Sequence, residues 1–255
     1  MIIDSFDDKS KAKINPISEE KRLKCDACIV TFSHIIEDYV IKEYNAKQCS
    51  EFVLVTKSYP IYIINYNGKT FAFYRTILSS TVSVAILEEV TKVIDTNKYI
   101  IFGGSGCLDK EIAHGAIMIP TEAYRDEGMS YHYVPASDYI TIKNANIVAD
   151  FMRTKKIPYI LGKTWTTDAF YRETENNMAK RKSEGCISVE MECSGMQAVC
   201  DFRGLQLYYF LTSGDLLDAP EWDKRIVEGE YAGTQHDIRH FDIAIDLADY
   251  VTNRI

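Results

Sequence analysis

Two acidic segments carry side chains of a type that could do chemistry. The run Ser188-Val189-Glu190-Met191-Glu192 opens a predicted helix, and Asp215 follows an apolar strand predicted at Leu205 to Leu211. A carboxylate that faces a pocket can accept two hydrogen bonds from a sugar diol, and Asp215 lies just past a strand end, where active-site groups of α/β folds cluster. The structural alternatives are acids that complement a helix dipole and, for Asp215, a turn or a helix cap.

Two further segments have the composition of a ligand site. Gly103-Gly104-Ser105-Gly106 follows a strand predicted at Tyr99 to Phe102. Its glycines let the backbone approach a ligand, and successive amides can cradle an anion. The run lacks the Lys-Ser/Thr ending of a Walker loop, so a structural turn is the alternative. Trp165 to Arg172 interleaves aromatic and polar residues, which suits either a stacked base or a core-packed loop.

These segments are connected by alternating strand-like and helix-like runs. The apolar runs that predict the other strands are Ala27 to Phe32, Glu51 to Lys57, Pro60 to Tyr66, Thr70 to Thr76, Ile117 to Pro120 and Tyr159 to Leu161. Helical periods predict helices over Ser80 to Ile94, Asn144 to Lys155, Val189 to Phe202 and His236 to Val251. Asn67-Gly68 predicts a hairpin. Such an order favours an α/β fold with a parallel or mixed sheet covered on both faces, in which ligands bind beyond the strand ends.

Composition limits the classes of function. The 255 residues form one predicted domain, 1–255, and the net charge of −8 disfavours binding of a nucleic acid polymer but not of a small nucleoside. Met1 to Lys13 has no apolar signal core, and the apolar runs are strand-length, so we expect a cytoplasmic protein without a membrane partner. Cys25 and Cys28 lack a second pair at zinc spacing, which predicts reduced thiols and no metal site.

Taken in order, these segments resemble the nucleoside phosphorylase superfamily, which includes purine nucleoside phosphorylases, uridine phosphorylases and nucleosidases. The resemblance runs from about Ala27 to Asp218 and is carried by Gly103 to Gly106, Tyr124 to Tyr133, Thr167 to Tyr171, Val189 to Glu192 and Thr212 to Asp215. It implies one three-layer α/β/α domain around a distorted, mixed and partly barrel-like sheet. It also implies a homodimer or homohexamer with sites near the subunit interface.

The resemblance also implies roles for single residues. Glu192 matches the glutamate that holds the ribose 2′- and 3′-hydroxyls, and Met191 matches the methionine that lines the sugar. Asp215 matches the aspartate of the purine-acting branch, which protonates or hydrogen-bonds N7 of the base. The remaining expected site residues are Trp165 and Phe170 at the base, Gly104, Ser105 and Arg75 at the acceptor, and Lys224 or Arg225 as an aid to Asp215.

The sequence departs from the family pattern where that family binds phosphate. Thr31 to Glu37 has neither the glycine nor the arginine of the family's phosphate loop, and Ile101 replaces a second arginine. Tyr74 to Ser79 replaces a Gly-Met-Gly strand end, and the N-terminal histidine is missing near Asn15-Pro16. A buried phosphate dianion needs paired cations or several amides. Arg75 or Lys57 could substitute for the lost arginines.

Three functional hypotheses follow from these residues. The first is a nucleoside phosphorylase that cleaves a purine nucleoside, with inorganic phosphate as co-substrate and no other cofactor. The second is a nucleosidase that uses water, which the missing arginines favour. The third is a non-catalytic nucleoside-binding protein, which the presence of both Glu192 and Asp215 disfavours.

Overall fold

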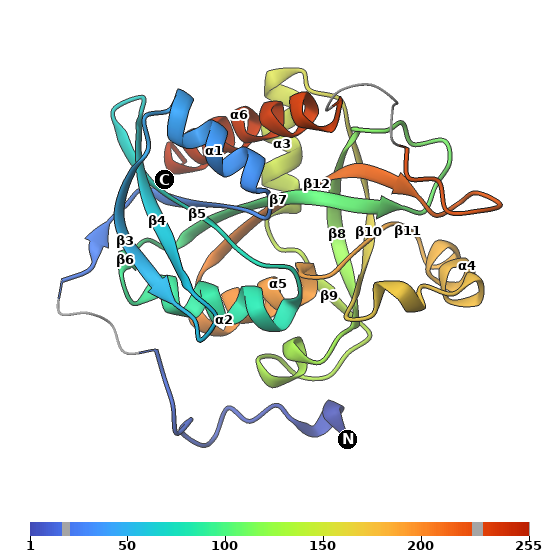
Figure 1. Cartoon of the computed structure of the whole chain (residues 1–255). Helices are drawn as coiled ribbons and strands as arrows, with labels where there is room; N and C mark the ends of the chain where they lie inside the picture. The colour runs from blue at the N-terminus through green and yellow to red at the C-terminus, as the bar shows by residue number, and fades with distance from the viewer. Residues whose placement is uncertain (17–20, 226–231, 255) are drawn as a thin grey trace.

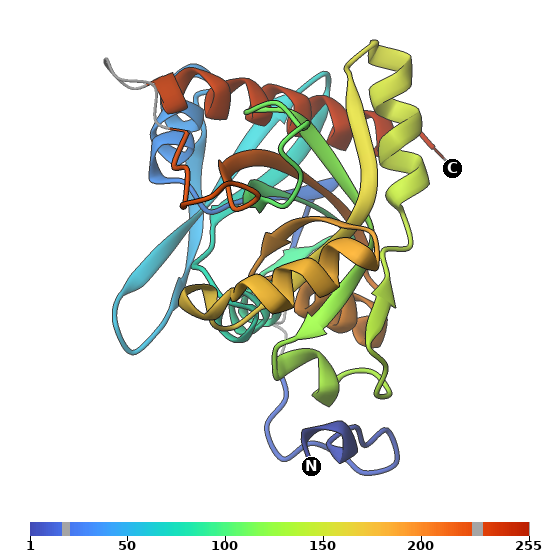
Figure 2. The ribbon, with the colours of Figure 1, turned by 90° about the vertical axis from the view of Figure 1, so that its right-hand side faces the viewer.

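The computed structural model describes residues 1–16, 21–225 and 232–254, and it arranges them in three layers around one large sheet. Helices α1, α3 and α6 cover one side of the sheet, α2 and α5 cover the other, and α4 lies at its end (Figures 1 and 2). This confirms the predicted α/β/α architecture.

The elements have the following bounds. The strands are β1 Leu23–Lys24, β2 Ala27–Thr31, β3 Lys47–Val53, β4 Ser58–Tyr66, β5 Lys69–Arg75, β6 Ile94–Asp95, β7 Lys98–Cys107, β8 Ile117–Asp126, β9 Tyr139–Thr141, β10 Tyr159–Thr167, β11 Cys186–Glu190 and β12 Gln206–Leu216. The helices are α1 His34–Glu43, α2 Ser80–Thr91, α3 Ala145–Lys155, α4 Glu175–Ser183, α5 Cys193–Arg203 and α6 Ala232–Thr252, with short 3₁₀ turns η1 Ile2–Asp4, η2 Met129–His132 and η3 Phe170–Arg172.

The large sheet closes on itself at one end. Its strand order is β11-β10-β8-β12-β7-β2-β5-β4-β3, β9 pairs with β8, and β11 also pairs with β7. The contact between β11 and β7, through Val189 opposite Gly106, turns the first five strands of this order into a partly closed barrel. The remaining strands continue as an open sheet. The distorted, mixed, barrel-like sheet is therefore confirmed.

Long-range packing fixes the open half of the sheet. Strand β2 is buried along its whole length, as its unbroken apolar run predicts. Asn67 and Gly68 both have positive φ, at 50° and 77°, and form the predicted hairpin turn between β4 and β5. Phe241 of α6 is fully buried, and its ring meets that of Phe73 at 5.4 Å. The apolar stripe of α6 thus covers this side of the sheet.

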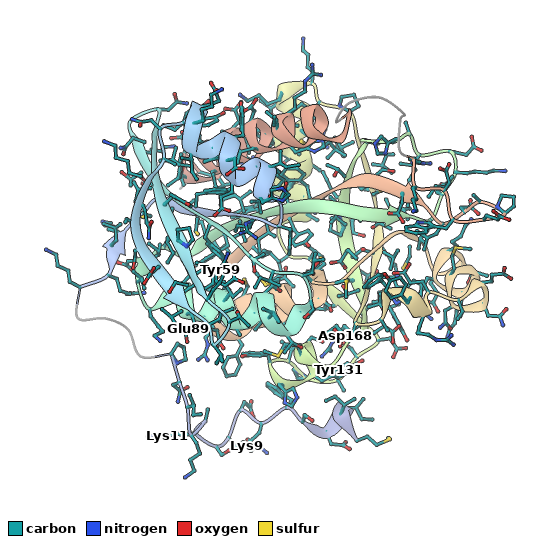
Figure 3. All side chains as sticks on the ribbon, viewed as in Figure 1. Lys9, Lys11, Tyr59, Glu89, Tyr131 and Asp168 are labelled. Atoms are coloured by element: carbon teal, nitrogen blue, oxygen red, sulfur yellow. The ribbon has the colours of Figure 1, made fainter. Side chains whose placement is uncertain are left out.

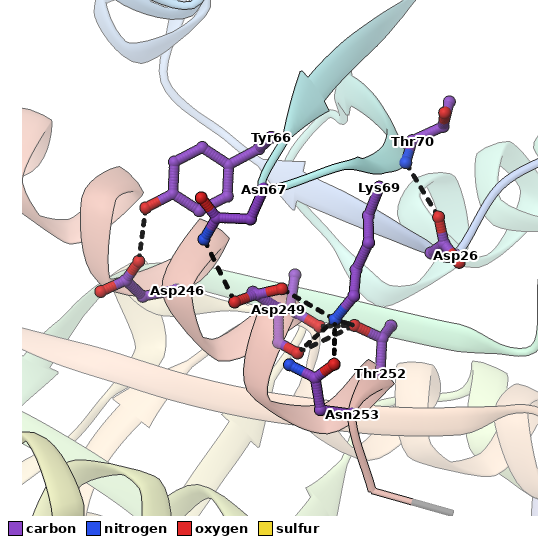
Figure 4. A network of polar contacts seen from close by, with 10 residues as sticks. Asp26, Tyr66, Asn67, Lys69, Thr70, Asp246, Asp249, Thr252 and Asn253 are labelled. Atoms are coloured by element: carbon purple, nitrogen blue, oxygen red, sulfur yellow. Dashed lines mark hydrogen bonds and ion pairs between the residues drawn. The ribbon is translucent and has the colours of Figure 1, made fainter.

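The β4–β5 hairpin also holds α6 through polar contacts, which Figure 4 draws. Lys69 Nζ donates to Thr252 Oγ1 at 2.7 Å and to the Asp249 carbonyl at 2.9 Å, and it forms an ion pair with Asp249 Oδ1 at 2.7 Å. Tyr66 donates its hydroxyl to Asp246 at 2.7 Å. These contacts join segments roughly 180 residues apart in the chain and fix the last helix to the sheet.

Several predicted elements have different bounds in the structure. The glycine run 103–106 and the segment around Asp215 are not loops, because they continue β7 and β12. The run 188–192 does not open a helix: it ends strand β11, and α5 begins only at Cys193. Helices α1 and α4 were not predicted. In α4, Met178 is the only large apolar side chain, so the segment has no apolar period that would reveal it.

Cys25 and Cys28 are buried free thiols, as are Cys193 and Cys200 on α5. Residues 1–16 run outside the layers, where Figure 3 shows Lys9 and Lys11. Among the described residues, no helix is long and apolar enough to span a membrane.

Candidate active site

A cavity of about 620 Å³ opens where the barrel closes. Gly106 of β7 and Val189 of β11, which pair at the closure, both line it. The other lining residues come from β7, from the end of β11 and the residues after it, from the end of β12 and the segment that follows, from the segment before α2, and from η3, α4 and the residues between them. We call it the acidic cavity, because six of its lining residues are acids: Glu173, Glu175, Glu190, Glu192, Asp215 and Glu221.

Glu190 and Glu192 line the cavity but are held differently. Glu190 accepts hydrogen bonds from the backbone N–H of Glu192 and of Cys193, both at 2.7 Å, so its carboxylate satisfies amides at the start of α5. Glu192 is 4% exposed, and its Oε1 accepts a hydrogen bond from the Ser79 N–H at 2.6 Å. Burial raises the pKa of both carboxyls, and the charge of Glu190 further raises that of Glu192.

The start of α2 positions Met191 and Glu192. Ser80 donates its backbone N–H and its hydroxyl to the Met191 carbonyl, at 2.8 Å and 2.9 Å. Ser79 has φ 90°, a conformation that costs free energy for any residue with a side chain. Its N–H points at the Glu192 carboxylate as a result. The strained residue therefore orients the buried carboxylate that faces the cavity.

A β-bulge places Asp215 at the cavity. The register between β12 and β7 shifts between Ser213 and Leu216, so Gly214 and Asp215 lie in the irregular part of the strand. Bulges next to sites commonly redirect a side chain. Asp215 Oδ2 accepts a hydrogen bond from Trp222 Nε1 at 2.6 Å. Both residues line the cavity.

The basic residues expected beside Asp215 have other partners. Arg225 Nη1 donates to Ser213 Oγ at 3.0 Å, and Lys224 Nζ lies 5.0 Å from the centre of the Trp222 ring. Neither residue lines the cavity. The direct partner of Asp215 is therefore Trp222, a residue that was not predicted.

The expected acceptor residues Gly104 and Ser105 also line the cavity, within β7. At the neighbouring Gly106, a Cβ atom would lie 2.7 Å from Leu217 Cδ1 and 2.8 Å from Val189 Cγ1. The glycine is therefore needed for close approach of the three strand segments at the barrel closure.

The aromatic segment is only partly at the cavity. Phe170 lines it, and the Phe170 ring centre lies 4.0 Å from that of Tyr171. Trp165 does not line it: the residue is 1% exposed, packs with Val189, and donates its indole N–H to Asp126 at 3.0 Å. Trp165 therefore lies behind Val189 in the cavity wall and not in the position expected for contact with a base.

Comparison with known proteins agrees with this arrangement. A family model described as the phosphorylase superfamily matches residues 28–234. The chain belongs to the phosphorylase superfamily. Its matches span 65% of the length of the first two curated relatives, one of them a purine nucleoside phosphorylase from Bacillus subtilis that is 23% identical over 59% of this chain.

Solved structures of a purine nucleoside phosphorylase and an AMP nucleosidase share the fold. A purine nucleoside phosphorylase from Toxoplasma gondii has a TM-score of 0.72 at 16% identity, covering 96% of this chain and all of its own. An AMP nucleosidase from Bacteroides thetaiotaomicron has a TM-score of 0.67 at 17% identity, covering 90% of this chain and 89% of its own. Both phosphorylases and nucleosidases thus use this architecture.

This superfamily member has no cation at the described lining of its cavity. Lysine, arginine and histidine are absent from the residues that line it. Arg75 donates to Glu37 Oε2 at 2.7 Å, and Lys57 lies 4.9 Å from the Tyr59 ring centre, so neither expected substitute reaches the cavity. Within the described ranges, no group of three or more His, Cys, Asp or Glu is placed to hold a metal ion.

The altered loop after β2 also leaves little room beside the glycine run. Phe32 stands in the stretch that lacks the superfamily's glycine and arginine. A Cβ atom on Gly103 would lie 2.9 Å from the Phe32 ring, so the ring already packs on the Gly103 backbone. An apolar ring therefore covers the β7 backbone at this point.

Sequence reasoning missed Ser79, Glu173 and Trp222. Ser79 belongs to the site because its N–H binds Glu192, which lies 113 positions later in the chain. Trp222 belongs to it because its indole N–H binds Asp215, seven positions earlier. Glu173 stands in a polar stretch between η3 and α4 that has no apolar period. Its position two residues after the Thr167 to Tyr171 segment, which the family resemblance includes, is the signal in the sequence that could have pointed to Glu173.

Proposed function

We propose that this protein cleaves the N-glycosidic bond of a purine nucleoside, with water as the acceptor at C1′. The observation that carries the proposal is one cavity that combines Glu192 and Asp215 and has no cation among its described lining residues. Two placed carboxylates suit binding of an uncharged sugar and base, and the third hypothesis, a non-catalytic protein, has no need of both.

Bond breaking leaves positive charge on the ribose and negative charge on the departing base. An enzyme accelerates such a step by stabilising both charges with placed groups. Glu192 would accept hydrogen bonds from the ribose hydroxyls, Met191 would line the sugar, and Asp215 would face N7 of the base. The carboxylates also favour positive charge on the ribose as the bond lengthens.

Water is favoured over phosphate by charge. A phosphate dianion among several carboxylates would be repelled and poorly solvated, unless cations compensate. The names of several relatives favour phosphorolysis, as in the purine nucleoside phosphorylase of Bacillus subtilis. If this protein does use phosphate, the cations that bind the phosphate must come from outside the described lining of the cavity.

The test is incubation with adenosine, inosine, guanosine and uridine, with and without phosphate. We expect free purine and free ribose at a rate that phosphate does not change. We also expect Asp215→Asn to lose roughly 10²–10⁴-fold in rate on purine nucleosides, the usual cost of disabling acid catalysis. Ribose 1-phosphate formed strictly with phosphate would replace hydrolysis by phosphorolysis. A preference for uridine that Asp215→Asn leaves unchanged would exclude the purine assignment.

A further inference from the structure

A buried threonine hydroxyl lies behind the acidic cavity and joins three elements. Thr166 is fully buried on β10, where it pairs with Glu190 of β11, and it is not among the described residues that line the cavity. Its hydroxyl donates to Glu190 Oε1 at 2.5 Å and accepts the Ser194 N–H at 3.1 Å. One side chain thus links β10 to the end of β11 and to the first turn of α5.

The Glu190 carboxylate extends this link to the backbone of Glu192. Its second oxygen, Oε2, accepts the N–H groups of Glu192 and Cys193, both at 2.7 Å. Its first oxygen accepts the Thr166 hydroxyl, and Thr164 Oγ1 lies 3.5 Å from that oxygen, at the limit of a hydrogen bond. A carboxylate that is bound at both oxygens has a fixed orientation. The backbone of Glu192 is therefore fixed with it.

Helix α5 has a second attachment at the same turn. The Ser194 hydroxyl donates to Glu127 Oε1 at 2.8 Å, and the buried Glu127 also accepts the Ser130 N–H at 3.0 Å. These contacts do not involve Thr166. Loss of the Thr166 hydroxyl should therefore leave α5 in place and release mainly the Glu190 carboxylate.

Charge adds to the importance of the Thr166 contact. Burial raises the pKa of Glu190 to about 7, whereas the hydrogen bonds from Thr166 and from the N–H groups of Glu192 and Cys193 act to lower it. Each of these donors stabilises the ionised form of Glu190. An ionised carboxylate accepts hydrogen bonds more strongly than a neutral carboxyl does. The Thr166 hydroxyl thus strengthens the contacts that hold the backbone of Glu192.

We propose that Thr166 is a positioning residue for the ribose: acting through Glu190, its hydroxyl holds Glu192 where that carboxylate accepts hydrogen bonds from both hydroxyls of the sugar diol. The inference rests on the proposed function. A displacement of about 1 Å in a placed group can lower a rate by about 10²-fold. Recognition of two hydroxyls by one carboxylate depends on its orientation. A 2′-deoxyribonucleoside offers one of the two hydroxyls and is therefore less sensitive to that orientation.

The variant that tests the assignment is Thr166→Val, which replaces the hydroxyl by a methyl group. On inosine we expect kcat/KM to fall by roughly 10²-fold. On 2′-deoxyinosine the loss should be smaller, so that the preference for the ribonucleoside shrinks by roughly tenfold, about the contribution of one hydrogen bond to a charged group. Thr166→Ser keeps the hydroxyl and should stay close to wild type on both nucleosides.

Two further comparisons separate positioning from folding. Thr121→Val is the matched control, because it removes a hydroxyl that donates to the Gly162 carbonyl of β10 at 3.2 Å, and it should leave both rates unchanged. In the Glu192→Gln background, Thr166→Val should have little additional effect, because the carboxylate that it positions is already absent. If Thr166→Val does not fold, Thr166→Ala removes the hydroxyl without placing a methyl group against Glu190.

A readout without turnover completes the test. In 9-deazainosine a C–C bond joins the sugar to the base, so the compound can be titrated by calorimetry without being cleaved. We expect Thr166→Val to weaken its binding more than that of its 2′-deoxy counterpart.

The outcomes distinguish the two proposals. An undiminished preference for inosine in Thr166→Val would overturn the positioning role and leave the proposed function standing. If wild-type protein cleaves no nucleoside, the proposed function fails. The positioning role then stands on the calorimetric difference, and it is wrong if Thr166→Val binds 9-deazainosine as wild type does or if wild type does not bind it.

Discussion

Glu190 and Glu192 are two residues apart, yet their carboxylates have different partners. Glu190 accepts hydrogen bonds from the backbone N–H groups of Glu192 and Cys193 at the start of α5, whereas Glu192 accepts the Ser79 N–H from the start of α2 and faces the cavity. The Glu190 carboxylate therefore lies where an acid complements the dipole of α5, and the Glu192 carboxylate lies where the predicted ribose role requires it.

The position of the Glu192 carboxylate at the cavity predicts the effect of Glu192→Gln. Turnover should be crippled, because a neutral amide cannot stabilise the charged ribose as a carboxylate does. At pH 4.5 and below, thermal unfolding should stay close to wild type, because the amide oxygen can still accept the Ser79 N–H. Steady-state kinetics and a melting curve on the same preparation test both statements. A fully active variant, or a grossly unfolded one, would reject the ribose role of Glu192.

The buried carboxyl of Glu192 also predicts that the stability of the protein depends on pH. Its pKa in the folded protein is raised above the ordinary value of 4.5, chiefly by burial. As the pH rises above 4.5 the unfolded chain loses this proton first, so unfolding releases a proton and the free energy of unfolding falls with rising pH. Urea titrations should show Glu192→Gln gaining stability relative to wild type over this range. A constant difference from pH 4.5 upward would contradict the raised pKa.

At the scale of elements, the predictable features were those encoded by neighbouring residues. Strand β2 and the Asn67-Gly68 turn follow from local composition, and both are confirmed. The lengths of β7 and β12 did not follow from local composition, because glycine and polar residues continue these strands where the barrel closes. Pairing with other strands, rather than local propensity, extends them.

The same distinction holds for the site. The motifs around Glu192, Asp215 and the glycine run converge on one cavity, as the resemblance implied. Trp165 and Arg75 do not join them, because each side chain is bound by an acid on another element, Asp126 in one case and Glu37 in the other. The partner of a polar side chain depends on which elements pack beside it in the folded protein. Residue types and spacing in a single sequence do not show that packing.

The attachment of α6 gives a prediction for an element. Lys69 is 18% exposed, and its ammonium group contacts Asp249, Thr252 and Asn253 near the end of the helix. Lys69→Met should therefore lower the free energy of unfolding by about 1–3 kcal/mol, because several partially buried acceptors lose their donor. Hydrogen exchange should show the loosening first in the last turns of α6.

A matched control comes from a more exposed pair. Lys143 is 63% exposed and forms an ion pair with Asp201. Lys143→Met should cost less than about 1 kcal/mol, as solvent-exposed pairs usually do. Equal losses in the two lysine variants would show that the contacts of Lys69 do not hold the helix.

At the scale of the molecule, the rim of the cavity leads us to expect at least a dimer. Four apolar side chains there are unusually exposed: Leu78 at 60%, Phe170 at 48%, Tyr171 at 85% and Trp222 at 62%. Exposed apolar groups around a site commonly mark an interaction surface. Light scattering should give a mass of two or more 29.1 kDa chains. A monomer with full activity would contradict the expectation.

The described lining of the acidic cavity has six acids and no cation, which has a consequence for selectivity among compounds that share a base and a sugar. Nucleotides share the base and the sugar of nucleosides but carry phosphate charge. Carboxylates repel that charge over several ångströms, most strongly where burial lowers the dielectric constant. The acidic lining should therefore weaken the binding of nucleotides to the cavity. Uncharged nucleosides would then occupy the cavity without competition from nucleotides.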